Sequence, residues 1–162
     1  MALVAAGVLV AALPAAAAAA KHPRNGHRVS GAATDPPLAF GQWTFFNFGG
    51  TGSLNSEGPF TFFRKTPVLL RVTDGFCRGD RFRVWDNGFP IFVTTNVAVD
   101  PSCDDIPSVG MPGPAWLDQT YSKGHFLLEP GRHAIRIQAS RSPFGSGGAW
   151  LKAIPMPVGS GS

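Results

Sequence analysis

Short runs of alternating apolar and polar residues, each bounded by Gly, Pro, Asn or Asp, constrain this chain most strongly. Such alternation places successive side chains on opposite faces of a strand and is typical of half-buried β-strands. No window after residue 20 sustains a helical period, and we therefore predict an all-β chain. The eight predicted strands are residues 39–48, 59–64, 68–73, 80–86, 90–95, 125–129, 132–139 and 148–153.

The same alternation predicts which residues face the core. In residues 80–86, Phe82 and Val84 are expected to point inward, and Arg81, Arg83 and Trp85 to point outward. Asn87 and Gly88 tolerate positive φ and therefore predict a hairpin turn after this strand. One buried face and one solvated face are typical of antiparallel sheets.

The N-terminal twenty residues carry no charge and end in an alanine run before Lys21. This pattern predicts a signal peptide over residues 1–20 that is cleaved on secretion. The alternative is an uncleaved membrane anchor, since the run is about long enough to span a bilayer. Residues 21–38 are predicted to be a flexible N-terminal segment and residues 155–162 a Gly/Ser/Pro-rich tail. We expect a secreted protein with no membrane contact after cleavage and no nucleic-acid partner.

Cys77 and Cys103 are the only cysteines of the chain. An oxidising compartment favours a disulfide between them, and closing such a loop stabilises a fold by about 3 kcal/mol. A zinc site is a weak alternative because the two cysteines lack CxxC spacing and a nearby histidine. The bond would fasten residues 96–124, which we expect to form a long loop, to the turn that contains Cys77.

Three segments carry a resemblance to a known family. They are FTFFRKTPVLLRVTDGFCRGDRFRVWDNGFPIFVTT (residues 60–95), FLLEPGRHAIRIQAS (126–140) and GGAWLKA (147–153). Together they resemble the secreted domains of bacterial proteins with a PEP-CTERM sorting tail and of related extracellular proteins of eukaryotic microbes. The resemblance implies a small β-sandwich without established catalytic activity. We predict a single antiparallel β-sandwich of jelly-roll type over residues 39–154. Residues 154–162 lack the Pro-Glu-Pro motif and basic tail of that family, so no sorting role is expected for them.

Aspartates gather near the two cysteines and suggest a calcium site. The candidate ligands are Asp74, Asp80, Asp104 and Asp105, with Asp100 nearby. Calcium takes six to eight oxygen ligands, which loops of β-sandwiches often supply. The alternative is that each aspartate caps its own turn by accepting backbone N–H groups, because no DxDxDG loop is present.

Arginine and tryptophan residues are predicted to project from the outer faces of the sheets. Forked guanidinium donors beside an aromatic ring can bind acidic sugars or carboxylates. The alternative is a solvated face with ordinary cross-strand pairs. The candidate ligand-binding residues are Arg71, Arg81, Arg83 and Trp85 on these faces, and Trp116, which we expect to be half-exposed in the loop over residues 96–124.

Two further patterns concern adhesion and catalysis. The tripeptide Arg78-Gly79-Asp80 matches an integrin-binding sequence, but Asp80 begins a predicted strand. His125 and His133 are candidate general bases, yet no nucleophile elbow or metal-ligand spacing accompanies them. We predict a non-enzymatic extracellular structural or binding module, with polysaccharide or a cell-surface protein as partner. A calcium-dependent carbohydrate-binding domain is the alternative, and an unrecognised hydrolase follows it.

Overall fold

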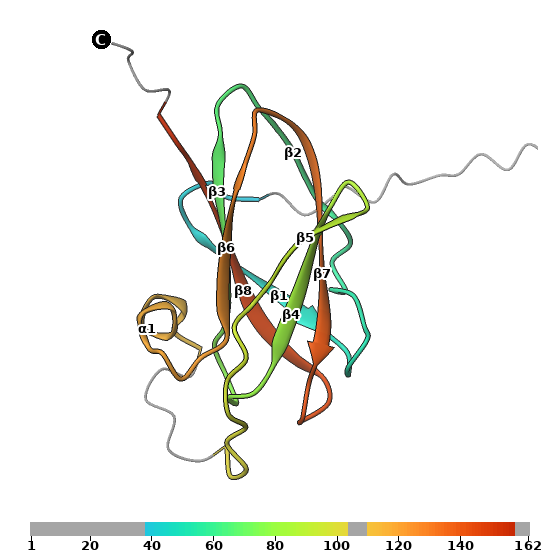
Figure 1. Cartoon of the computed structure of the whole chain (residues 1–162), viewed down its shortest axis with the longest axis vertical. Coiled ribbons are helices and arrows are strands. Elements are labelled where there is room, and N and C mark those ends of the chain that lie inside the picture. The colour runs from blue at the N-terminus through green and yellow to red at the C-terminus, as the bar shows by residue number, and fades with distance from the viewer. Residues whose placement is uncertain (1–37, 104–109, 158–162) are drawn as a thin grey trace, which may run out of the picture. The chain divides into compact units, whose positions relative to one another are not determined.

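A computed structural model describes residues 38–103 and 110–157 of the chain. These residues form eight strands and one short helix (Figure 1). In chain order the elements are β1 (Trp43–Phe48), β2 (Phe60–Arg64), β3 (Val68–Asp74), β4 (Arg81–Asp86), β5 (Phe89–Val93), α1 (Pro112–Leu117), β6 (Lys123–Leu128), β7 (Gly131–Arg141) and β8 (Gly147–Pro155).

The strands form two antiparallel four-stranded sheets, in the orders β1-β8-β3-β6 and β2-β7-β4-β5 (Figure 1). The prediction of an all-β sandwich is therefore confirmed. Its jelly-roll type stays a prediction. The strand order supports it, because β1 pairs with β8, β2 with β7, β3 with β6 and β4 with β5, as in a long hairpin wrapped round itself.

Every predicted strand has a counterpart, with ends that differ by a few residues. The largest difference is at β1, which begins at Trp43 because Gly41 adopts a positive φ of 78° in a turn. The expectation that residues 96–124 form only a loop was wrong at α1. There Pro112 occupies the first turn of the helix and Ala115 is buried. Among the described residues no helix has the length and apolar character needed to cross a membrane.

The core lies between the two sheets and is built from the inward positions of the alternating strands. Phe82 and Val84 of β4 are fully buried, as predicted, and Phe82 makes edge-to-face contacts with Phe46 and Phe48. Burying each side chain of this size stabilises the fold by about 1.5–3 kcal/mol. The core is completed by Leu38, Phe60, Val68, Leu70, Val72, Leu128, Ile135, Ile137, Ala139, Ala149, Leu151 and Ala153.

One irregularity shapes the outer face of the second sheet. Arg81 pairs with Arg141 and Phe82 pairs with Ala139, so Ser140 is an extra residue on β7. A bulge of this kind bends the strand and re-aims the next side chain. The Ser140 hydroxyl donates a hydrogen bond to the Arg81 carbonyl oxygen over 3.0 Å, which fixes the bulge. Arg141 is consequently brought to the same side of the sheet as the arginines of β4, with which it lines one pocket.

Candidate ligand-binding site

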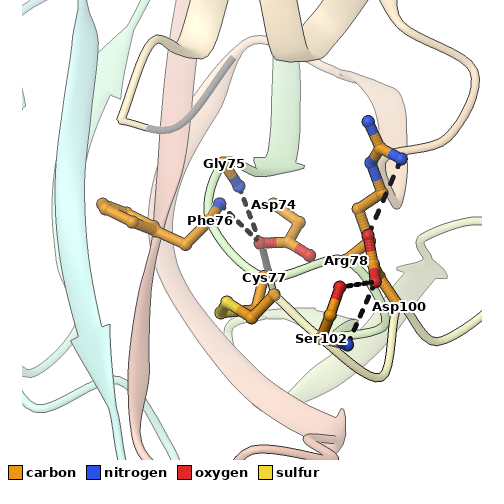
Figure 2. Close-up of a disulfide and its surroundings, with 8 residues drawn as sticks. Asp74, Gly75, Phe76, Cys77, Arg78, Asp100 and Ser102 are labelled. Carbon is orange, nitrogen blue, oxygen red and sulfur yellow. Dashed lines mark hydrogen bonds and ion pairs between the residues drawn. A yellow bond between two sulfur atoms is a disulfide. The ribbon is translucent and has the colours of Figure 1, made fainter. Parts of the chain in front are cut away.

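The predicted disulfide joins Cys77 and Cys103, whose Cα atoms lie 5.0 Å apart. It fastens the segment that ends at Cys103 to the turn between β3 and β4. The same two segments are also held by the Asp100 N–H, which donates to the Arg78 carbonyl oxygen over 3.2 Å. Arg78 and Asp100 form an ion pair of 4.0 Å beside the disulfide (Figure 2).

Two of the aspartates near this disulfide, Asp74 and Asp100, act as turn caps. The Oδ1 atom of Asp74 accepts the N–H groups of Gly75 and Phe76 over 2.7 and 3.3 Å (Figure 2). Asp100 accepts the N–H and hydroxyl groups of Ser102 in the same manner. Turn capping, the alternative to calcium binding, is therefore observed at both positions.

Asp74 and Asp80 nevertheless form a buried carboxyl pair. Burial first, and then the negative charge of Asp80, raises the pKa of Asp74 to about 7. Burial also raises the pKa of Asp80 to about 6, against the opposing effects of a Ser142 hydrogen bond and the Arg141 charge. Within the described residues, Oδ2 of Asp74 and Oδ1 of Asp80 have no hydrogen-bond partner. The repulsion between two such carboxylates is relieved when one of them takes up a proton or when both bind a cation.

The calcium hypothesis names four ligands, of which the structure describes Asp74 and Asp80. Asp104 and Asp105, two of its four predicted ligands, lie outside the described residues. In the part of the chain that the structure does describe, no three His, Cys, Asp or Glu side chains are grouped to hold a metal ion. Calcium binding at Asp74 and Asp80 therefore stays a prediction.

The adhesion tripeptide is not presented to solvent. Asp80 is only 5% exposed, and Arg78 lies within 4.0 Å of both Asp100 and Asp118. An integrin-type ligand needs its carboxylate accessible to the partner. The geometry of Asp80 therefore disfavours the adhesion interpretation of these residues.

The five predicted ligand-binding residues fall into three separate places. Arg71 and Trp116 lie over the outer face of the β1-β8-β3-β6 sheet, where the indole of Trp116 covers the Arg71 guanidinium at 4.9 Å. Arg71 is half-buried on this face, because α1 packs over β3. Trp43 and His125 also contact Trp116, so these aromatic side chains pack together with Arg71 over this face of the sheet.

Trp85 lies in a pocket on the outer face of the other sheet. The pocket has a volume of about 360 Å³, and Arg136 stands directly opposite Trp85 across the β4–β7 ladder. Leu54, 45% exposed, forms part of its rim. An indole beside a guanidinium and an amide is a combination that can stack on a sugar ring and bind its hydroxyl groups. The pocket is lined by Gly52, Leu54, Trp85, Gly88, Arg136 and Gln138.

Arg81 and Arg83 line a second pocket on the same face, with a volume of about 390 Å³. Its third arginine, Arg141, was missed by sequence reasoning. Strict alternation places residue 141 on the core side, and only the bulge at Ser140 brings it to the outer face. The other residues lining this pocket are Val93, Asn96 and Ser140.

The two candidate general bases lie apart from both pockets. The Nδ1 atom of His133 lies 2.8 Å from Oδ2 of Asp86, and its Nε2 atom lies 2.9 Å from the Glu129 carbonyl oxygen. Both ring nitrogens therefore hold the start of β7 to the end of β4 and to the turn that precedes β7. His125 packs edge-on against Trp116 at 6.3 Å.

Comparisons of this chain with family models, with curated proteins and with solved structures found no match. The resemblance to the secreted family therefore stays a prediction, and the proposals below depend on the geometry of the two outer-face pockets.

Proposed function

We propose that this protein is a secreted, non-enzymatic module that binds extracellular polysaccharide through the outer face of the β2-β7-β4-β5 sheet. The observation that carries the proposal is the pocket at Trp85. Its aromatic ring, the Arg136 guanidinium and the Gln138 amide all come from rigid strands, so the binding groups are held in place before a ligand arrives.

The disulfide and the sequence of residues 1–20 support an extracellular location. Disulfides persist in oxidising compartments, and Cys77 and Cys103 are bonded. A secretory signal over residues 1–20 would deliver the chain to such a compartment.

The geometry of His133 supports a structural role for this histidine over a catalytic one. His133 uses both ring nitrogens in structural contacts with Asp86 and Glu129, and His125 packs on an indole. General-base catalysis needs an imidazole nitrogen within reach of a substrate proton. A hydrolase that used His133 would therefore require these contacts to rearrange, whereas His125 is exposed and lines a pocket of about 420 Å³ beside Trp116.

A panel of immobilised polysaccharides tests this function, with Trp85→Ala as the decisive variant. Loss of the indole should weaken binding about fivefold to tenfold, since one aromatic contact contributes about 1 kcal/mol or more. Phe89→Ala is the matched control, because Phe89 belongs to the same hairpin, is 74% exposed and does not line the pocket. A wild-type protein that binds none of the polysaccharides, or a Trp85→Ala variant that binds as tightly as Phe89→Ala, would refute the proposal.

A calcium-dependent form of the same function is the second candidate. The unpartnered oxygens of Asp74 and Asp80 favour it, since two carboxylates can begin a site for a hard cation. Repeating the polysaccharide panel in EDTA and in millimolar calcium separates the two candidates. Binding that survives EDTA unchanged would exclude the calcium-dependent form.

A further inference from the structure

Three arginines converge on one side of the β2-β7-β4-β5 sheet, and two of them are held in place by the backbone. The Nε atom of Arg81 donates to the Thr94 carbonyl oxygen over 3.2 Å. Arg141 donates from Nε to the Gly79 carbonyl oxygen and from Nη2 to the Val97 carbonyl oxygen, over 2.8 and 2.6 Å. These bonds orient the guanidinium planes and leave further N–H groups of each arginine available to a ligand.

Arg83 completes the group and is the most exposed of the three. It stands between Arg81 and Trp85 among the outward positions of β4, and it pairs across the ladder with Gln138. Gln138 also lines the Trp85 pocket. The arginine pocket and the Trp85 pocket therefore adjoin along one face of β4 and β7.

Among the described residues, no ion pair balances the charges of these three arginines. No carboxylate lines the pocket, and in the described residues the ion pairs involve Arg78 and His133 rather than any of these three arginines. Asp80 interacts electrostatically with Arg141, and its carboxyl, with a pKa raised to about 6 by burial, still carries a partial balancing charge at neutral pH. Gathering three like charges costs free energy that a bound anion would recover.

We propose that the pocket formed by Arg81, Arg83 and Arg141 binds the carboxylate or sulfate group of an acidic polysaccharide. Planar guanidinium groups bind such oxyanions through paired N–H donors, while the Asn96 amide adds a neutral donor at the pocket wall. A volume of about 390 Å³ lies within the usual range of ligand pockets. The inference rests on the proposed polysaccharide-binding function, and it names the acidic class of ligand and the residues that select it.

A titration with sodium sulfate tests the pocket without any polysaccharide. The Nε–H signals of the arginines are followed by ¹H–¹⁵N NMR, with sodium chloride at the same ionic strength as reference. We expect saturable shifts at Arg81, Arg83 and Arg141 with sulfate only. Arg83→Gln should weaken sulfate binding about tenfold, the effect of losing one charge-assisted hydrogen bond. Arg132→Gln removes one positive charge near the start of β7, away from this pocket, and should leave sulfate binding unchanged.

Two further arms identify the anionic group. Immobilised heparin presents sulfates, polygalacturonate presents carboxylates, and dextran is the neutral reference. Binding to one of the acidic polymers should fall about tenfold in Arg83→Gln, with little change in Arg132→Gln. Arg83→Lys should recover part of the loss, since it keeps the charge and lacks the forked donors.

The results separate this inference from the proposed function. Sulfate shifts that do not saturate, or sulfate binding that weakens equally in Arg83→Gln and Arg132→Gln, would refute anion binding by this pocket. Binding of dextran that depends on Trp85, with no effect of Arg83→Gln on any polymer, would refute anion binding by the arginine pocket. The proposed polysaccharide-binding function would stand. Saturable sulfate binding at the three arginines without binding of any polysaccharide would keep the anion pocket and refute the proposed function.

Discussion

Replacing Asp74 with Asn tests the buried carboxyl pair, because the change removes one charge and keeps the shape of the side chain. Asp74 is fully buried, and its pKa is raised from the ordinary value of 3.8 to about 7. In the unfolded chain the carboxyl should titrate near its ordinary value. Each pKa unit between the two states corresponds to about 1.4 kcal/mol, so Asp74 alone should change the unfolding free energy by about 4 kcal/mol.

The sign follows from which state holds the proton. Between about pH 4 and about pH 7 the folded chain keeps a proton on Asp74 that the unfolded chain releases. This stabilisation is complete below about pH 4 and is lost as the pH rises through about 7. Asp80, with a pKa raised to about 6, acts in the same direction. The pKa values of Asp100 and Asp118 are lowered, first by hydrogen bonds from the residue two positions further on, so these groups act only below about pH 4.

Urea unfolding of the oxidised protein at about pH 4, about pH 6 and about pH 8 measures this effect. We expect the wild-type unfolding free energy to fall across the range, and the fall to be smaller by about 4 kcal/mol in Asp74→Asn. Asp100→Asn is the matched control, since it makes the same change beside the same disulfide and should keep the wild-type slope. An Asp74→Asn variant with the wild-type slope, or a wild-type stability that rises with pH, would refute the protonated carboxyl pair.

Three further predictions concern the disulfide, calcium and the core. Intact-mass measurement after alkylation without reductant should find no free thiol, and Cys77→Ser should lower the unfolding free energy by about 2–5 kcal/mol; two labelled cysteines would contradict this. The calcium hypothesis predicts a melting temperature several degrees higher in about 5 mM calcium than in EDTA, lost in Asp80→Ala and not reproduced by Mg²⁺; an unchanged value would leave the proton as the species that relieves the repulsion. Ile137→Ala should lower the unfolding free energy by about 2–5 kcal/mol, whereas a loss below about 1 kcal/mol would mean that β7 is not central to the core.

The strands were predictable because one physical rule governs them. A side chain on a half-buried strand alternates between core and solvent, and Phe82 and Val84 follow that rule to full burial. The hairpin after Asp86 was equally predictable, since Asn and Gly tolerate positive φ. Asn87 and Gly88 adopt φ values of 49° and 85°. The helix at residues 112–117 was not predicted, because six residues rich in Pro and Gly carry no helical periodicity.

The candidate site was predicted only in part, because its grouping depends on sheet geometry. Arg81, Arg83 and Trp85 could be placed outward from alternation along β4 alone. Alternation could not show that α1 brings Trp116 over Arg71. The outward position of Arg141 could not be predicted for a different reason. One extra residue on β7 moves Arg141 to the outer face of the sheet, and no local sequence pattern marks such a bulge.

The most direct test of the proposed binding face uses the four tryptophans as reporters. Each indole gives one ¹H–¹⁵N signal, and the tryptophans occupy different parts of the fold. On titration with the polysaccharide fragment that binds best in the panel, the Trp85 indole signal should shift saturably, because Trp85 lines the outer pocket of β4 and β7. The signals of Trp43 and Trp116, which pack together over the other sheet, should stay unchanged. Saturable shifts at Trp43 or Trp116 with a stationary Trp85 signal would place the ligand on the opposite sheet and contradict the account.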